Sequence, residues 1–126
     1  MAELPSVNQA EIELLRGVAH SDADGPVFML NLNKYKSEAG YPDGQLYTDY
    51  MSVLATLLTQ VGGRILWRTR VLGQVVGGQE IDEALGIWYP TNQAFLNLMT
   101  APASDENMRL RALAVAHADL HRCDAY

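Results

Sequence analysis

The sequence predicts an α+β protein built on an antiparallel sheet, and three observations support this. The run 27–35 has the two-residue alternation of a strand, and the stretch 44–61 places apolar side chains on one helical stripe. Two more strand-like runs and a second helical stretch follow, with a weak last strand. Strand, helix, strand, strand, helix, strand is the ferredoxin-like order. We expect it to occupy residues 1–126 as one domain, the usual outcome for 126 residues.

Composition excludes several classes of partner. The formal charge is -6, so we expect no nucleic-acid partner and no anionic membrane partner, because phosphates require a basic surface. No apolar run approaches the length that spans a bilayer, and no signal peptide is visible. A single cysteine, Cys123, excludes an intrachain disulfide and favours a reducing cytoplasm.

The first elements are a helix and the longest strand. We expect the N-terminal helix at about 7–19, with Ser6 as its cap and a loop at 21–26 that ends it. The strand 27–35 should then direct its side chains to two faces. We predict that the first set packs under helices and that the second set, which includes two amides, lines a semi-polar hollow; the sets are Phe28, Leu30 and Leu32, and Met29, Asn31 and Asn33.

The middle of the chain alternates loops and regular elements. Residues 36–44 read as a mobile loop, and the helix that opens at Asp43 or Gly44 ends at Gly62-Gly63. The second strand, 64–72, should hold Trp67 on one face. The opposite face should carry a row of arginines with Leu66, namely Arg64, Arg68 and Arg70.

An interrupted hairpin with glycines at 73, 77 and 78 precedes the third strand, 84–89, which ends at Pro90. Thr91 can cap the next helix. A further helix begins at 104–106 and extends to His117, and residues 120–126 could form a short edge strand. If the sheet leaves Met29 and Trp88 on a bare face, that apolar surface favours a homodimer closed sheet to sheet.

Several stretches resemble the DUF1330 family of the dimeric α+β barrel superfamily. They are 25–35, Tyr47 and Tyr50, 61–67, and Tyr89-Pro90 followed by Ala94-Phe95-Leu96 and Met99. The resemblance implies a ferredoxin-like subunit that pairs into a dimeric barrel, and related families include cofactor-independent monooxygenases, lactone isomerases and haem enzymes. Relatives tend to carry histidines where this chain reads Arg109-Leu110-Arg111, so only Arg111 matches.

The candidate substrate-binding residues are Asn31, Trp88, Arg68, Asn33, Met29 and Tyr35. An amide can orient a carbonyl, an indole can stack on a flat ligand, and Arg68 can bind a carboxylate or enolate. Each also has a plainer interpretation, because such residues often tie neighbouring backbone, fill a core or pair with surface acids such as Glu80 or Asp82. For Tyr47 and Tyr50, packing between helix and sheet is the plainer interpretation, and a phenol at the cavity mouth the functional one.

His117 and His121 stand four apart, which on a helix would suit a shared metal. No third ligand accompanies them, so we predict neither a metal nor a cofactor, and a haem would need His117 as its axial ligand. Together with the predicted hollow, the DUF1330 resemblance implies a small-molecule enzyme that performs oxygenation, isomerisation or cyclisation in the barrel cavity. The alternative is a binding or accessory protein of the same fold that turns nothing over.

Overall fold

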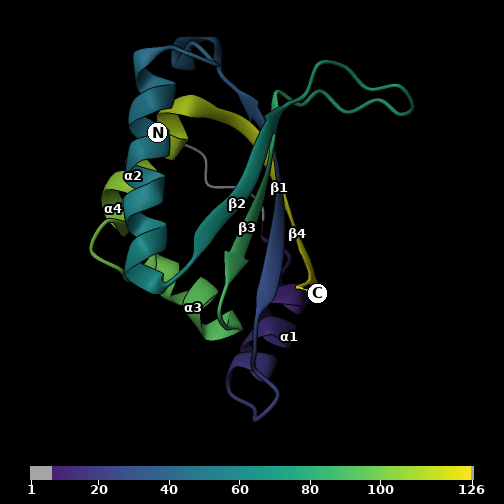
Figure 1. Cartoon of the computed structure of the whole chain (residues 1–126), viewed down its shortest axis with the longest axis vertical. Coiled ribbons are helices and arrows are strands. Elements are labelled where there is room, and N and C mark those ends of the chain that lie inside the picture. The colour runs from purple at the N-terminus through teal and green to yellow at the C-terminus, as the bar shows by residue number, and fades with distance from the viewer. Residues whose placement is uncertain (1–6, 126) are drawn as a thin grey trace.

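The structure, a computed structural model, describes residues 7–125 and confirms the α+β prediction (Figure 1). Four antiparallel strands form one sheet in the order β2-β3-β1-β4, which is the ferredoxin-like arrangement. The elements are α1 (Gln9–Ala19), β1 (Val27–Tyr35), η1 (Ser37–Ala39), α2 (Gln45–Val61), β2 (Arg64–Arg70), β3 (Glu83–Tyr89), α3 (Asn92–Leu96), η2 (Asn97–Met99), α4 (Ser104–Ala114) and β4 (Val115–Asp124).

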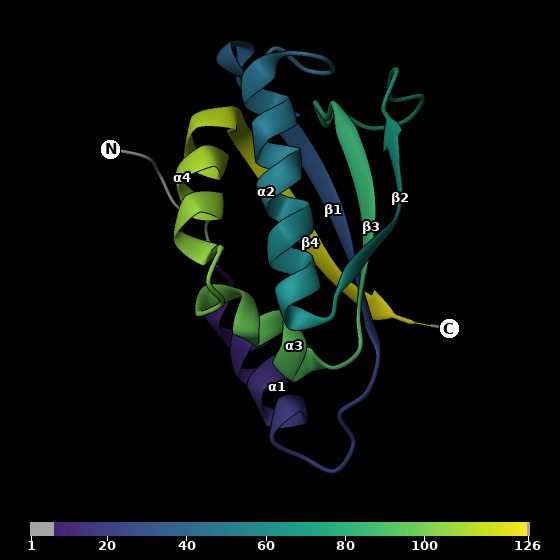
Figure 2. The same cartoon turned by 60° about the vertical axis from the view of Figure 1, so that its left-hand side comes forward.

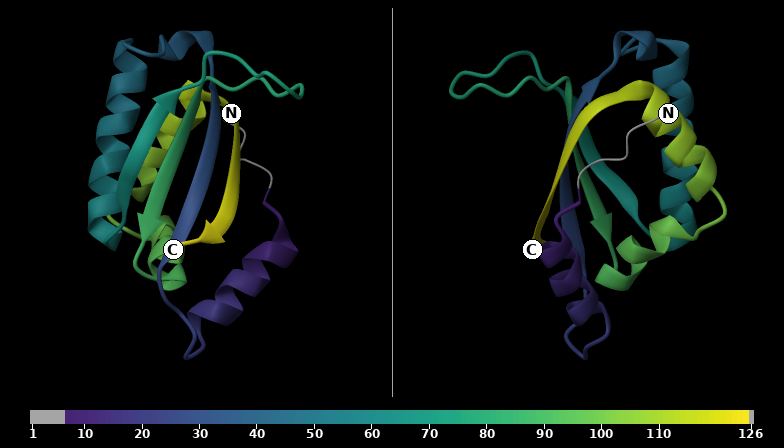
Figure 3. Two further views of the ribbon diagram at one scale, coloured as in Figure 1. Left: turned by 45° about the vertical axis from the view of Figure 1, so that its right-hand side comes forward. Right: turned by 180° about the vertical axis from the view of Figure 1, so that it is seen from behind.

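Helices α2 and α4 lie side by side on one face of the sheet (Figure 2). We call this the helix face and the opposite side the open face. Between the helices and the sheet lies a core that includes Leu15, Met29, Leu58, Leu85, Ile87 and Leu110. The open face is not covered by any helix in the part of the chain that is described (Figure 3).

The two faces of β1 are the reverse of the sequence prediction. Met29 and Asn33 are buried on the helix face, whereas Phe28 lies on the open face, where its ring packs above Gly86. The prediction of a hollow lined by the amides rested on the fact that an apolar core does not require them. Asn33 instead finds a polar partner beneath the helices, and that partner removes the cost of burying the amide.

Strand β2 contains one extra residue, and this changes the pattern predicted for it. Ile65 pairs with Ile87 and Trp67 pairs with Gly86, so Leu66 is left between them in a β-bulge. Residues directly opposite one another share a face. Before the bulge, Arg64 therefore lies on the open face, opposite Trp88.

Beyond the bulge, Arg68 pairs with Leu85 and Arg70 pairs with Glu83, so both arginines belong to the helix face. The predicted row that joined Arg64 to them is therefore wrong. The strand also ends at Arg70 rather than at residue 72.

Trp67 does not pack in the core, although core packing is the plainer interpretation for a tryptophan on a strand. Its side chain is 44% exposed on the open face, tilted against Phe28 with ring centroids 6.1 Å apart. The two rings close over Gly86, where an added Cβ would come within 2.5 Å of Trp67 and 2.7 Å of Phe28. A side chain at this position would force one or both rings to move, so glycine allows them to pack as they do.

The segment that joins β2 to β3, residues 71–82, is a long arm rather than an interrupted hairpin. It leaves the body on the side away from α2 and α4 (Figure 3). Its base is closed by a hydrogen bond of 2.8 Å from the Val71 amide to the Asp82 carbonyl oxygen. Three apolar side chains of the arm are almost fully exposed: Leu72 near the base at 91%, and Val75 and Val76 near the tip at 100% and 86%.

The predicted cap of α2 is confirmed, because Gly62 adopts the left-handed conformation with φ 82°. Helix α4 ends earlier than predicted, at Ala114, and β4 begins at the next residue. His117 and His121 therefore lie on a strand, about 13 Å apart along it, which is too far to share a metal.

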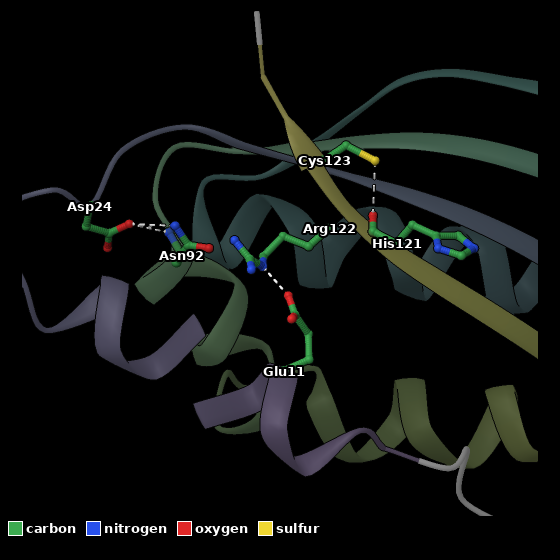
Figure 4. A network of polar contacts seen from close by, with 6 residues as sticks. All are labelled: Glu11, Asp24, Asn92, His121, Arg122 and Cys123. Atoms are coloured by element: carbon green, nitrogen blue, oxygen red, sulfur yellow. Dashed lines mark hydrogen bonds and ion pairs between the residues drawn. The ribbon is translucent and has the colours of Figure 1, made fainter. Parts of the chain in front are cut away.

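The N-terminal helix α1 packs beside α3 at one end of the sheet. Asp24, in the loop after α1, accepts a hydrogen bond from the Asn92 amide at 2.7 Å (Figure 4). It also accepts one from the Gln93 amide at 3.2 Å, so it caps α3. Arg122 of β4 forms an ion pair with Glu11. The predicted cap Ser6 lies outside the described residues, and Asn8 stands at the cap position instead.

Candidate functional site

The most distinctive chemistry on the helix face surrounds the carboxyl group of Glu83. This side chain is only 3% exposed. The Tyr35 hydroxyl donates to Glu83 Oε1 at 2.6 Å, and the Tyr47 hydroxyl donates to Oε2 at 2.7 Å. Two phenols therefore satisfy one buried carboxyl, which removes much of the cost of burying it.

The hydrogen-bonded chain extends outward from both tyrosines. Asn33 Nδ2 donates to the Tyr35 hydroxyl at 3.2 Å, and an Arg68 guanidinium nitrogen donates to the Tyr47 hydroxyl at 3.0 Å. Each phenol thus accepts one hydrogen bond and donates another. The order is Arg68, Tyr47, Glu83, Tyr35, Asn33, and we call this chain the Glu83 network. It connects the exposed Arg68 to a carboxyl in the interior.

The sheet register explains why distant residues meet here. Asn33 of β1 stands directly opposite Glu83 of β3, and Tyr35 follows two residues later on the same face. Arg70 of β2 flanks Glu83 from the other side, so Glu83 lies between two strands at their common end. Tyr47 reaches the carboxyl from the first turn of α2, which covers that end.

Aromatic rings form one wall of the site. Tyr41 stacks on Tyr35 with ring centroids 5.0 Å apart, and it meets the edge of Tyr47 at 4.8 Å. Tyr41 is only half-buried, unlike the other two phenols. It belongs to the connection 36–44, in which Gly40 has a φ of 66° and a Cβ at Gly44 would lie 2.6 Å from the Ala39 carbonyl oxygen. Both glycines are therefore needed to place Tyr41 over the network.

The environment keeps the phenols protonated. Burial raises the pKa of Tyr35 far above its usual value, and the hydrogen bond to Glu83 raises it further. Burial and the same carboxyl also raise the pKa of Tyr47, despite the nearby Arg68. At neutral pH both hydroxyls are therefore donors, which suits the stabilisation of a negative oxygen and not the removal of a proton.

Asp82, next to Glu83 in sequence, braces the end of β1. Its Oδ2 accepts from the Tyr35 amide at 2.8 Å, and Oδ1 accepts from Lys34 Nζ at 3.4 Å. Its own amide donates to the Asn33 carbonyl oxygen. Asp82 thus fixes the backbone that carries both Asn33 and Tyr35, while its neighbour Glu83 receives the phenols.

The structure brings three of the six predicted site residues together, namely Asn33, Tyr35 and Arg68. Asn31 is half-buried and donates to the Met29 carbonyl oxygen at 3.0 Å, and Met29 packs in the core. Asn31 stands opposite Leu85 on the helix face, whereas Trp88 stands opposite Phe28 on the open face. The expectation that Asn31 and Trp88 share one hollow is therefore wrong, and Trp88 instead lies under Arg64 at 5.0 Å.

Sequence reasoning missed Glu83 and Tyr41. The run 80–83 has the composition of a polar turn, and Tyr41 falls within the loop predicted at 36–44. The one available signal for Glu83 is that it directly precedes the apolar strand predicted at 84–89. That signal does not show that Glu83 is buried, whereas the nearby Glu80 is exposed.

A hollow of about 100 Å³ lies apart from the Glu83 network, at the base of the arm. It is lined by Leu32, Gln79, Glu80, Ile81, His117 and Asp119. The strand residues among these belong to the open face. Leu32 alternates along β1 with residues such as Met29 that face the helices, and Asp119 stands directly opposite Leu32. Within residues 7–125, no three His, Cys, Asp or Glu side chains gather as metal ligands.

No family model matches the sequence, and no curated protein matches it. Solved structures do match. The RPA0582 protein of Rhodopseudomonas palustris, of unknown function, is 23% identical with a TM-score of 0.76, over 96% of this chain and 95% of that one. A dabb family protein with a ferredoxin-like fold from Mesorhizobium loti is 10% identical with a TM-score of 0.58, over 81% of this chain and 98% of that one.

A dimeric ferredoxin-like protein of unknown function from Thermobifida fusca is 9% identical with a TM-score of 0.54, over 80% of this chain and 92% of that one. These likenesses define the class: a protein with a ferredoxin-like α+β fold. The DUF1330 resemblance stays a prediction. None of the helices described for residues 7–125 combines the length and apolar character needed to cross a bilayer.

Proposed function

We propose that the protein is a small-molecule enzyme that transfers a proton at a carbon next to a carbonyl group. That step is shared by the isomerisation and cyclisation reactions expected from the sequence. The observation that carries the proposal is the buried Glu83 carboxyl, held by two neutral phenols and connected to the exposed Arg68.

In this proposal the substrate enters beside Tyr41 and its carbonyl oxygen takes the hydrogen bond that Tyr47 now donates to Glu83. That exchange frees a lone pair on Glu83 Oε2. The carboxylate then removes the proton from the adjacent carbon, and the electron pair moves onto the carbonyl oxygen as an enolate. Tyr47 stabilises that oxygen by donation, as Arg68 supports Tyr47. Return of the proton to another carbon completes an isomerisation, and attack by the enolate carbon on a second carbonyl completes a cyclisation.

All of these roles use the chain's own residues, in keeping with the prediction of neither metal nor nucleotide.

A second candidate is the binding protein without turnover, and one observation favours it. Both Glu83 oxygens are already satisfied and the side chain is 3% exposed, so the network can serve as a rigid floor for a ligand.

The test is deuterium incorporation, followed by proton NMR in D₂O with acetylacetone and phenylpyruvate as probes. Catalysis predicts that the wild-type protein accelerates exchange and that Glu83→Gln abolishes the acceleration. Tyr47→Phe should reduce it by about 100-fold, the typical effect of losing one such donor. The matched control is Tyr50→Phe, a buried phenol of the same helix that lies beside Arg111 instead of donating to Glu83.

If these probes raise the melting temperature of the wild-type protein but the protein does not accelerate exchange, the second candidate, a binding protein without turnover, is favoured. If Glu83→Gln folds and exchanges at the wild-type rate, the proton-transfer proposal is wrong.

We also propose that the protein works as a homodimer that covers the open faces of two copies. Trp67, 44% exposed, and the half-buried Phe28 and Trp88 give that face an apolar character unusual for a surface left in water. The Thermobifida fusca neighbour is described as dimeric, which supports the same arrangement here. Sedimentation equilibrium of the wild type and of Trp67→Lys tests it, because the lysine should shift the chain toward monomers.

A further inference from the structure

Apart from Asp82 at its base, the arm of residues 71–82 takes no part in the Glu83 network, and its first half, which follows β2, is unusually apolar. Leu72, Val75 and Val76 are between 86% and 100% exposed, and the stretch 71–79 contains no charged residue in a chain whose formal charge is -6. Fully burying one such side chain contributes about 1.5–3 kcal/mol. Leaving all three in water is unfavourable, so the arm has the composition of a segment that becomes covered.

The direction of the arm indicates what covers it. Figures 1 and 3 show the arm extending past the open face and away from α2 and α4. A second copy that packs on the open face would therefore lie beside the arm. No other part of the described chain extends toward that side, so the arm and the open face form one continuous surface.

The hollow on the open face gives the tip a place to bind. Its volume of about 100 Å³ is close to that of three water molecules in the liquid, and thus to a small branched side chain. Leu32 and Ile81 supply apolar walls, and His117 and Asp119 supply a polar rim. Because the hollow adjoins the base of each arm, a two-fold arrangement lets each tip reach the partner's hollow while its own hollow receives the partner's tip.

We propose that the arm is an exchange arm, in which Val75 and Val76 of one copy pack into the hollow beside Leu32 in a second copy of this chain. This inference rests on the homodimer proposed above. Asp82 lies at the base of the arm and Arg70 directly precedes the arm, and both flank the Glu83 network. Docking of the tip would therefore restrain the strand ends that carry the candidate site.

The first experiment measures dimer dissociation by sedimentation for the full-length double variant Val75→Asp/Val76→Asp. We expect the dissociation constant of the dimer to rise by at least about 100-fold, because four valines per dimer lose their apolar contacts. The matched control is Gly73→Asp/Gly78→Asp, which adds the same charges to the same arm at positions with free space around them. This control should change the dissociation constant by less than about 10-fold.

The second experiment tests where the tip binds. In a Cys123→Ser background, a tagged Val75→Cys chain is mixed with an untagged Asp119→Cys chain and treated with a short bis-maleimide. We expect a mixed cross-linked dimer, and much less of it when Glu38→Cys, an exposed residue of η1, replaces Asp119→Cys.

The outcomes separate the two proposals. If Trp67→Lys dissociates the dimer but the valine variant does not, the sheet-face dimer stands and the exchange arm is wrong. Absence of the mixed cross-link overturns the assigned hollow, and a wild-type protein that is monomeric at every concentration overturns both proposals. Weakened association in the valine variant together with the mixed cross-link supports the exchange arm.

Discussion

Tyr35 and Glu83 are 48 positions apart in the chain, yet the Tyr35 hydroxyl lies 2.6 Å from Glu83 Oε1 in the interior of the protein. The contact joins the end of β1 to the start of β3. It also makes Glu83 depend on its phenol partners, because a buried carboxyl without donors is costly. The first prediction follows from that dependence.

Replacement of Glu83 by alanine should lower the free energy of unfolding by about 2–4 kcal/mol, because two buried phenols lose their acceptor. Urea unfolding followed by circular dichroism measures the change. Glu80→Ala is the control, since Glu80 is exposed and should alter stability by less than about 0.5 kcal/mol. Equal stability of the two variants would show that the Glu83 network contributes little to the fold.

Stability should fall at alkaline pH. Burial raises the pKa values of Tyr35, Tyr47 and Tyr89 above the ordinary value of 10.0. Above pH 10 the unfolded chain loses phenolic protons that the folded chain retains, so the unfolded state is favoured as pH rises. The stabilisation is complete below pH 10 and is lost progressively above it.

Urea unfolding at pH 8 and at pH 11 should show this loss, and Tyr89→Phe should reduce it, since Tyr89 is buried without a carboxylate partner. A wild-type unfolding free energy that is the same at both pH values would contradict the prediction.

Substitution of Gly86 by alanine should destabilise the protein by about 1–3 kcal/mol, the usual cost of overpacking. The new methyl group would meet the rings of Trp67 and Phe28, which must move away. Urea unfolding measures the loss, and a shift in tryptophan emission should accompany it as Trp67 moves toward water. Gly78→Ala is the matched control, because nothing lies within 4 Å of a Cβ at that position. An unchanged emission spectrum in Gly86→Ala would argue against this packing.

Loss of the Asp24 cap should cost about 1 kcal/mol, the typical value for a helix cap. Although burial opposes it, hydrogen bonds from Asn92, Gln93 and Gly25 lower the pKa of Asp24 below its ordinary value of 3.8. The stabilisation is therefore present above pH 3.8 and is lost as the pH falls through the folded value. Asp24→Ala and the exposed Asp22→Ala, compared by thermal unfolding at pH 7, should differ by this amount.

Much of the architecture was predictable from local pattern. Strand 27–35, the helix that ends at Gly62 and the cap Thr91 are all confirmed, because alternation, glycine caps and hydroxyl caps are local effects. The helical reading through His117 was wrong because the short-range spacing of 114–117 also fits the start of a strand. The choice of face for β1 was wrong because it depends on which residues the helices bring, and not on the strand itself.

The candidate site was predictable only in part for the same reason. Asn33, Tyr35 and Arg68 were chosen for their side-chain chemistry, and each belongs to the Glu83 network. Their common partner comes from a stretch that looked like a solvated turn. Burial of Glu83 results from its register against Asn33 and from the cover of α2, and neither is encoded near residue 83.

The extra residue in β2 has a consequence for how this strand tolerates change. Because Leu66 is the unpaired residue of the bulge, its removal would leave Ile65 and Arg68 facing the helices and Trp67 facing outward. Deleting Trp67 instead would bring Leu66 into its place above Gly86. A related sequence that lacks residue 66 would therefore keep the side chains of β2 on their present faces. Loss of a paired residue elsewhere in β2 would instead turn the following side chains to the opposite face.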